Sequence, residues 1–153
     1  MTNGSLAQTL ALVLGVAFLG IGVLGFIPGI TTDLGDIKFA GKDSPSELLG
    51  IFQVSILHNI VHLLFGIAGV ALSRTTANAK MYLLYSGVIY VALFVYGVIV
   101  GTGDDANFIP ANGADDVLHL VFAVGLLGSW ISKGSDEMVR DRTATPPSAP
   151  LAP

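Results

Sequence analysis

The feature that most constrains this chain is a set of four long stretches without a charged side chain. They run over Leu6–Ile27, Leu48–Ser73, Met81–Gly103 and Val117–Ser132. A helix needs about 20 mainly apolar residues to cross the hydrocarbon core of a bilayer. The first three stretches meet that length, so each is expected to be a membrane-spanning helix.

The fourth stretch is short, but the residues before it extend the helix. Asn112 is a good N-cap residue, and Asp115 and Asp116 fall in a first turn, which favours negative charge. A helix over residues 113–132 is long enough to cross a bilayer. The chain is therefore predicted to be an all-α bundle of four transmembrane helices.

Composition agrees with a membrane protein. Hydrophobic residues make up 52 % of the chain and charged residues 12 %, whereas a soluble domain has about a quarter of its residues charged. The absence of cysteine excludes disulfides, thiolate metal sites and thiol catalysis. A net charge of −4 without a basic run argues against nucleic acid as a partner. The expected partner is the lipid bilayer.

The start of the second helix allows two interpretations. Residues 44–47 read Ser-Pro-Ser-Glu, a capping box with proline at the first helical position. A helix from there would be about 42 Å long at 1.5 Å per residue, longer than a span. Either it tilts strongly, or Pro45–Leu57 is an interfacial helix and the span begins near Ser55. We favour the break, because Gln53, Ser55 and the residues at 58–59 make the middle polar.

Basic residues in the short connections predict the orientation. Arg74 and Lys80 lie between the second and third stretches, and three more basic residues follow the fourth. The charged residues of the connection before the fourth stretch are all aspartates. Positive charge marks the cytoplasmic side, so both termini are expected in the cytoplasm. Residues 1–132 form the membrane domain, and residues 133–153 are expected to be a disordered cytoplasmic tail.

The chain also contains a weak internal repeat. The segment HLLFGI at 62–67 resembles HLVFAV at 119–124, and Gly15, Gly25 and Gly29 align at one offset with Gly87, Gly97 and Gly101. Two copies of a helical hairpin are one explanation. Chance is the other, since apolar segments resemble one another easily.

Polar residues inside the spans are the candidate site: His58, Asn59, His62, Asp116 and His119. An ionisable group inside a span is a functional-site hypothesis by default. His62 and His119, at equivalent repeat positions, could together ligate a haem iron or, with Asp115, a divalent metal. The alternative is that these side chains only hydrogen-bond between helices and fix the bundle.

No motif indicates a catalysed reaction. The glycines do not form a phosphate-binding loop, and no serine, histidine and acid are spaced as in a hydrolase. Glycines such as those at 25 and 29 are read instead as small residues that let helices approach closely. We therefore expect a protein that is not an enzyme.

Several short segments resemble one known family. They are LHNIVHL at 57–63, preceded by GIFQV at 50–54; GFIPG at 25–29; ANFIP at 106–110; and ADDVLHL at 114–120. Over about residues 6–131 the chain resembles the bacterial membrane proteins catalogued as domain of unknown function 4383. The resemblance implies four helices and a membrane location, but no activity. It marks the five candidate residues as signature positions without giving them roles.

These observations lead to one leading hypothesis and two alternatives. The leading hypothesis is a structural or accessory protein of a bacterial cytoplasmic membrane, acting through helix packing without a cofactor, as a homo-oligomer or beside a membrane-protein partner. The first alternative is a haem- or metal-binding protein using His62 and His119. The second is a transporter or channel for a small solute, against which the sparse polar lining argues.

Overall fold

Four helices dominate the computed structural model, which describes residues 5–101 and 104–131. They are α1 (Leu6–Leu24), α2 (Ile56–Leu72), α3 (Thr76–Val100) and α4 (Gly113–Ile131). The predicted all-α architecture is confirmed, and α4 has the predicted length. The predicted tail at residues 133–153 lies outside the described residues.

Each helix begins at a polar side chain that caps its free backbone N–H groups. The hydroxyls of Ser5, Ser55 and Thr75 accept hydrogen bonds at the starts of α1, α2 and α3. Asn112 Oδ1 accepts from the backbone N–H groups of Ala114 and Asp115, at 2.9 and 3.1 Å. The N-cap predicted at Asn112 is therefore confirmed.

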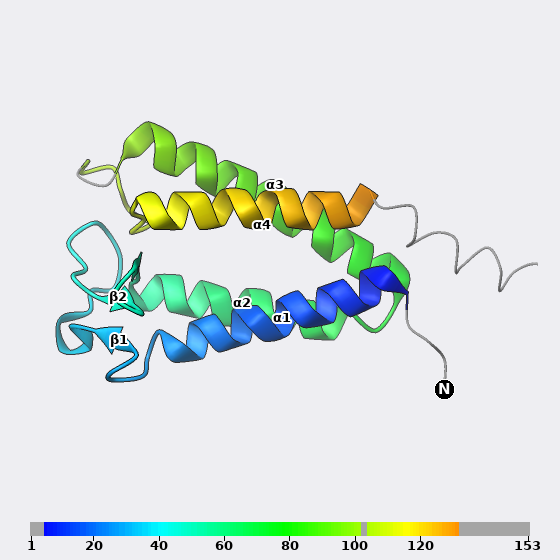
Figure 1. Cartoon of the computed structure of the whole chain (residues 1–153), viewed down its shortest axis with the longest axis horizontal. Coiled ribbons are helices and arrows are strands. Elements are labelled where there is room, and N and C mark those ends of the chain that lie inside the picture. Colours follow the sequence, from blue (N-terminus) through cyan, green and yellow to red (C-terminus); the bar gives the residue numbers. More distant parts are fainter. Residues whose placement is uncertain (1–4, 102–103, 132–153) are drawn as a thin grey trace, which may run out of the picture.

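The residues between α1 and α2 form a small sheet, which the sequence analysis missed. Its antiparallel strands are β1 (Thr31–Thr32), β2 (Glu47–Leu48) and β3 (Phe52–Gln53), in the order β1-β2-β3. A short 3₁₀ helix, η1, covers Leu34–Asp36. The sheet and residues 104–112 cover one end of the helices, which we call the sheet end (Figure 1).

The sheet corrects the prediction of an interfacial helix at Pro45–Leu57. Ser44 does not cap a helix, because its hydroxyl donates to the carbonyl of Val54 at 2.6 Å. Leu49 and Gly50 have positive φ angles of 57° and 66°, which make the tight turn between β2 and β3. The predicted break near Ser55 is confirmed, because α2 begins at Ile56.

The helices pair as two hairpins, α1 with α2 and α3 with α4 (Figure 1). In the first hairpin the backbones touch at glycines: a Cβ on Gly15 would lie 2.7 Å from the nitrogen of Val70, and one on Gly66 would lie 2.6 Å from the nitrogen of Leu19. Gly29 takes no part, since it lies beyond the end of α1 with a φ of 87°. Its predicted role as a packing glycine is therefore wrong.

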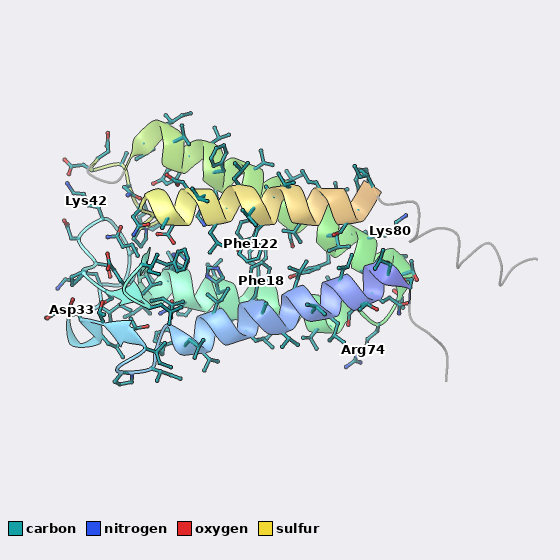
Figure 2. All side chains as sticks on the ribbon, viewed as in Figure 1. Phe18, Asp33, Lys42, Arg74, Lys80 and Phe122 are labelled. Atoms are coloured by element: carbon teal, nitrogen blue, oxygen red, sulfur yellow. The ribbon has the colours of Figure 1, made fainter. Side chains whose placement is uncertain are left out.

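Aromatic side chains fill the space between the hairpins. Phe18 of α1 and Phe122 of α4 point toward each other, with ring centroids 5.0 Å apart (Figure 2). Tyr90 of α3 stacks on Phe18 at 5.6 Å. The two hairpins therefore meet through side chains, whereas the helices of the first hairpin meet through their backbones.

The helices have the length and composition of membrane spans. α1, α3 and α4 are each long and apolar enough to cross a membrane. The apolar α2 has 17 residues, the lower end of the range of about 17–25 for a span. Ser5, Arg74 and the end of α4 lie at one end of the helices, which we call the terminal end, opposite the sheet end (Figures 1 and 2).

Candidate functional site

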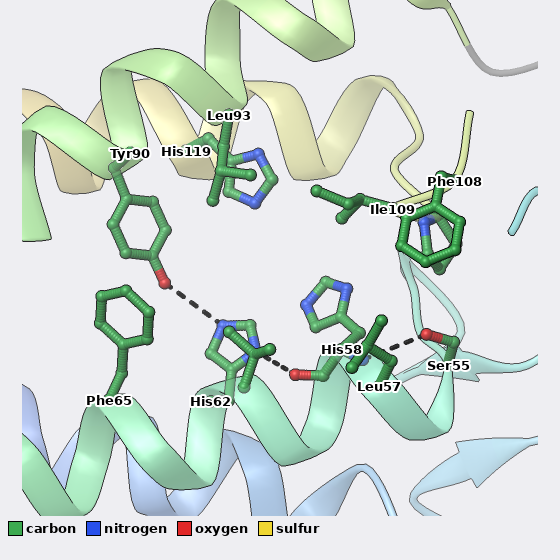
Figure 3. Close-up of a pocket in the computed structure, with 12 residues that line it drawn as sticks. Ser55, Leu57, His58, His62, Phe65, Tyr90, Leu93, Phe108, Ile109 and His119 are labelled. Carbon is green, nitrogen blue, oxygen red and sulfur yellow. Dashed lines mark hydrogen bonds between the residues drawn. The ribbon is translucent and has the colours of Figure 1, made fainter. Parts of the chain in front are cut away.

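All three histidines of the chain come together near the sheet end of the helices, between the two hairpins. His58 and His62 come from α2 and His119 comes from α4, and Figure 3 shows the rings of His58 and His119 entering the same space from opposite sides. The His58 and His62 rings stack with their centroids 4.6 Å apart. Tyr90 of α3 completes the group, with its ring centroid 5.5 Å from that of His119.

The hydrogen bonds of His62 fix which of its ring nitrogens carries the proton. Nδ1 lies 3.1 Å from the carbonyl oxygen of His58, and a carbonyl can only accept, so Nδ1 is the donor. In the neutral ring Nε2 is then an acceptor, and the Tyr90 hydroxyl donates to it at 3.4 Å. His62 therefore has both nitrogens in use.

The other two histidines have unused hydrogen-bonding groups. Nδ1 of His58 and Nδ1 of His119 are buried and have no hydrogen-bond partner among the described residues. His119 is only 4 % exposed. Burying a polar group without a partner costs about 1–3 kcal/mol, so these two nitrogens are costly unless a further molecule contacts them.

A cavity of about 170 Å³ lies beside these nitrogens. Its polar lining includes the three imidazoles, Tyr90 and Ser55, and its remaining walls are apolar. On the other side of the imidazoles a second cavity of about 120 Å³ lies toward α1 and the sheet, and it also touches Asp115. The histidines and Tyr90 thus separate two cavities, and we call the larger one the imidazole cavity.

Two of the five candidate residues face elsewhere. Asn59 of α2 is fully buried, and its Nδ2 donates at 2.8 Å to the carbonyl of Gly25, the residue that follows the end of α1. A carboxylate oxygen of Asp116 in α4 lies directly over Gly97 in α3, where a Cβ would have no room. Each of these side chains contacts the other helix of its own hairpin, and neither lines the imidazole cavity.

This arrangement bears on the internal repeat. Gly25 and Gly97 are equivalent in the proposed repeat, and so are Asn59 and Asp116. The structure brings each glycine against its own polar partner, at the same end of the two hairpins. The equivalent contacts favour a duplicated hairpin over chance. Asn59 Oδ1 and Asp116 Oδ1 both have no hydrogen-bond partner among the described residues. The two hairpins differ in chemistry because only the Asn59 amide also donates to its glycine.

The loop before α4 forms the end of the cavity nearest the sheet, and the loop between α1 and α2 contacts it. Phe108, Ile109 and Pro110 line the cavity, and the backbone N–H of Gly41 donates to the carbonyl of Phe108 at 2.8 Å. Lys42 and Asp105 form an ion pair with a 2.6 Å N–O distance. Their hydrogen bond lowers the pKa of Asp105 and raises the pKa of Lys42.

Asp115 joins this loop region to α4 through one of its two carboxylate oxygens. Its Oδ2 accepts the backbone N–H groups of Gln53 in β3 and Asn112, at 3.0 and 2.9 Å. Within residues 5–101 and 104–131 no three histidine, aspartate or glutamate side chains are close enough to hold a metal ion. The predicted metal set of His62, His119 and Asp115 therefore does not match the geometry.

The size of the cavity also bears on the haem alternative. An apolar cavity of about 150 Å³ holds one benzene molecule. The imidazole cavity, at about 170 Å³, has room for one six-membered ring but not for the four pyrrole rings of a porphyrin. In addition, Nε2 of His62 already accepts a hydrogen bond from the Tyr90 hydroxyl. The described arrangement thus fits a small molecule better than a haem.

Sequence reasoning did not find Tyr90, although a signal was present. Tyr90 is the tyrosine nearest the middle of an otherwise apolar stretch, and a buried tyrosine hydroxyl needs a hydrogen-bond partner. Its partner, His62, lies on another helix.

Comparison with known proteins gives one match. The model of a family described as a domain of unknown function, DUF4383, matches residues 8–131. The chain matches no curated protein and no solved structure. Because the family model covers most of the chain, including all but the first two residues of α1, the other three helices and the imidazole cavity, the chain belongs to the family DUF4383.

Proposed function

We propose that this protein is a membrane-embedded binding protein that holds a small uncharged molecule in the imidazole cavity. The observation that carries the proposal is the buried, unpaired imidazole of His119 beside a cavity of about 170 Å³. Small-molecule sites are typically concave and mostly apolar, with a few polar groups that converge on the ligand. The proposed activity is binding, without a catalysed reaction.

Charge supports the choice of an uncharged molecule. None of the residues that line the imidazole cavity carries a formal charge at neutral pH, taking histidine as neutral. Burying an isolated ion in such surroundings costs far more than burying a hydrogen-bonded neutral group. Asp115 lines the second cavity, and its carboxylate accepts two backbone N–H groups.

The proposal is tested by filling the cavity. Leu93 of α3 lines it, so Leu93→Trp would take up much of its volume. Val98→Trp places the same side chain on the exposed face of α3 and is the matched control. Protein isolated in native lipid particles is extracted, and small molecules are measured by mass spectrometry. A compound present with wild type and Val98→Trp but lost with Leu93→Trp is expected; extracts that do not differ would contradict the proposal.

We also propose that the chain crosses a bacterial cytoplasmic membrane four times, with both termini in the cytoplasm. What supports this is that basic residues near the ends of the spans mark the cytoplasmic side. Arg74 and Lys80 lie at the terminal end and three more basic residues follow α4, whereas the loops of the sheet end carry two, Lys38 and Lys42. A phosphatase that is active only outside the cytoplasm should be inactive when fused after Ile131. Activity of that fusion would overturn the proposed orientation.

A structural or accessory role through helix packing is the second candidate. It is favoured by the small share of each long span that is buried within the chain, 28 % for α1, 28 % for α3 and 22 % for α4. The remaining surface is free for lipid, a second copy or a membrane-protein partner. Native mass spectrometry from nanodiscs distinguishes these: a discrete oligomer or complex supports the accessory role, and a monomer in every preparation contradicts it.

A further inference from the structure

The hydrogen-bonding groups around the imidazole cavity are mostly acceptors. The interaction of His58 with the carbonyl of Pro110 requires the nitrogen facing it to carry hydrogen. The unpartnered Nδ1 is then the bare acceptor nitrogen of a neutral His58 ring. The Tyr90 hydroxyl gives its only hydrogen to His62, so its oxygen can only accept from a further molecule.

His119 adds one donor and one acceptor, whichever tautomer it takes. The described residues provide no hydrogen-bond partner for its ring. Together with His58 and Tyr90, His119 gives three acceptors and one donor, and the Ser55 hydroxyl, which accepts the N–H of His58, provides a second donor. A ligand that satisfies the three acceptors must carry hydrogen-bond donors of its own, because an ether, an ester or a simple carbonyl could use only the donors of the cavity. Hydroxyl groups are donors that add no charge.

Size and surroundings limit the ligand further. A volume of about 170 Å³ holds one substituted six-membered ring. Phe65, Tyr90 and Phe108 provide aromatic walls for such a ring. Val61 and Phe108 are also 38 % and 59 % exposed on the outer surface. The cavity therefore reaches the surface of the chain, and a substituent of the ring can extend from it.

We propose that the imidazole cavity binds the hydroxylated ring of a lipid-soluble quinol or phenol, with hydroxyl groups donating to Nδ1 of His58 and to the ring of His119. This inference rests on the proposed function and names its ligand class. It requires the reduced form to bind better than the quinone, because a quinone has two carbonyl acceptors and no hydroxyl donor.

Three probes of nearly equal size test the inference: methylhydroquinone, methyl-p-benzoquinone and toluene. The chain has no cysteine, so the quinone has no thiol to modify. Because all three histidines line the cavity, protein labelled with ¹⁵N only in histidine reports on this site alone. Imidazole NMR spectra are recorded in detergent micelles, and partition into empty micelles is subtracted.

Methylhydroquinone is expected to bind most tightly and to shift the ring signals of His58 and His119. The loss of one hydrogen bond is worth about 1 kcal/mol. The quinone, which can still accept from His119, is expected to bind about fivefold more weakly, and toluene, which loses both hydrogen bonds, about 30-fold more weakly. His119→Leu should weaken the binding of methylhydroquinone about fivefold and leave the binding of toluene unchanged. His58→Leu gives a second, independent test if His119→Leu does not fold.

The outcomes separate this inference from the proposed function. Equal binding of toluene and methylhydroquinone, in wild type and in His119→Leu, would overturn the quinol assignment while the cavity remains a binding site. Tighter binding of the quinone would also overturn it. No binding of any probe, together with no effect of Leu93→Trp on the extracts, would remove both proposals.

Discussion

The contacts inside the first hairpin and the contacts between the two hairpins are built differently. Inside the α1–α2 hairpin, glycines bring backbones so close that no Cβ fits at Gly15 or Gly66. Between the hairpins, aromatic rings and histidines leave cavities of about 170 and 120 Å³. The comparison teaches that the hairpin supplies rigid support, whereas the loosely filled interface between hairpins provides the space for a ligand.

The buried polar groups of the two regions differ in the same way. Asn59, inside the first hairpin, donates to the Gly25 carbonyl at 2.8 Å, while its Oδ1 has no partner among the described residues. His119, between the hairpins, is almost as deeply buried, and its ring makes no hydrogen bond to those residues. A buried side chain that hydrogen-bonds to another segment stabilises a fold, while a buried polar side chain without any hydrogen bond calls for another explanation. We assign Asn59 to stability and His119 to binding.

The largest effect is expected from breaking the backbone contact inside the first hairpin. Gly15→Leu would place its Cβ 2.7 Å from the nitrogen of Val70, which is backbone and cannot move aside easily. Overpacking of this kind costs about 1–3 kcal/mol. Unfolding by SDS in mixed micelles, followed by circular dichroism, measures the loss.

Gly20→Ala is the matched control for that change. A Cβ there meets nothing within 4 Å, and alanine is a better helix former than glycine by roughly 0.5–1 kcal/mol. The control variant should be as stable as wild type or more so. Equal destabilisation by both substitutions would mean that the close contact between α1 and α2 does not hold the hairpin.

A smaller effect is expected from removing the polar contact at Gly25. Asn59→Leu loses the hydrogen bond to the Gly25 carbonyl, and hydrogen bonds between membrane helices average about 0.6 kcal/mol with a maximum near 1.7. The same unfolding assay should show a loss in that range. The equivalent change in the other hairpin, Asp116→Asn, should cause no loss, because an amide can donate to Gly97 as Asn59 does to Gly25. A loss as large as that of Asn59→Leu would argue against equivalent hairpins.

Without ligand, His119→Leu is expected to cause no loss of stability and to raise it, because it removes a buried nitrogen that has no hydrogen-bond partner. The histidine ring makes no hydrogen bond to the described residues, so its removal breaks none. The same micelle titration, without added ligand, measures this. A loss of about 0.6 kcal/mol or more would instead support a purely structural role for His119 between the hairpins.

The smallest effect is expected at the exposed ion pair of the sheet end. Lys42→Ala removes the partner that lowers the pKa of Asp105. That stabilisation is present above the ordinary Asp105 pKa of 3.8 and is lost as the pH falls through the lowered value. It is lost again when the pH rises through the raised pKa of Lys42, above 10.5. The free energy of unfolding of wild type should therefore be slightly larger than that of the variant at neutral pH in low salt. The two values should agree in high salt or in strong acid.

Local signals in the sequence were sufficient to predict where the four helices lie. Uncharged length located all four, and Asn112 marked the start of α4 because an N-cap acts within its own turn. The sheet was missed because Ser44-Pro45-Ser46-Glu47 has the residues of a capping box. The structure that these residues adopt depends instead on distant contacts: Ser44 hydrogen-bonds to Val54, and Leu48 pairs with Thr31 in the sheet. Local propensity yields to such tertiary pairing when the two conflict.

The candidate site was only partly readable for a related reason. The four-residue spacing of His58 and His62 predicts a shared helix face, and the structure stacks their rings. Spacing along one helix does not say which other helix that face meets. Asn59 and Asp116 turn toward Gly25 and Gly97 of their own hairpins, while Tyr90 joins the histidines from α3.

The sequence by itself thus determined the number of helices, their apolar surfaces and the residues able to carry polar chemistry inside them. These properties follow from composition and from interactions a few residues apart. Only the tertiary structure decided which of the polar residues share a cavity, how large that cavity is and which nitrogens in it remain unpaired. These depend on how the aromatic side chains of the two hairpins pack against one another, which is a property of distant segments together and of neither alone.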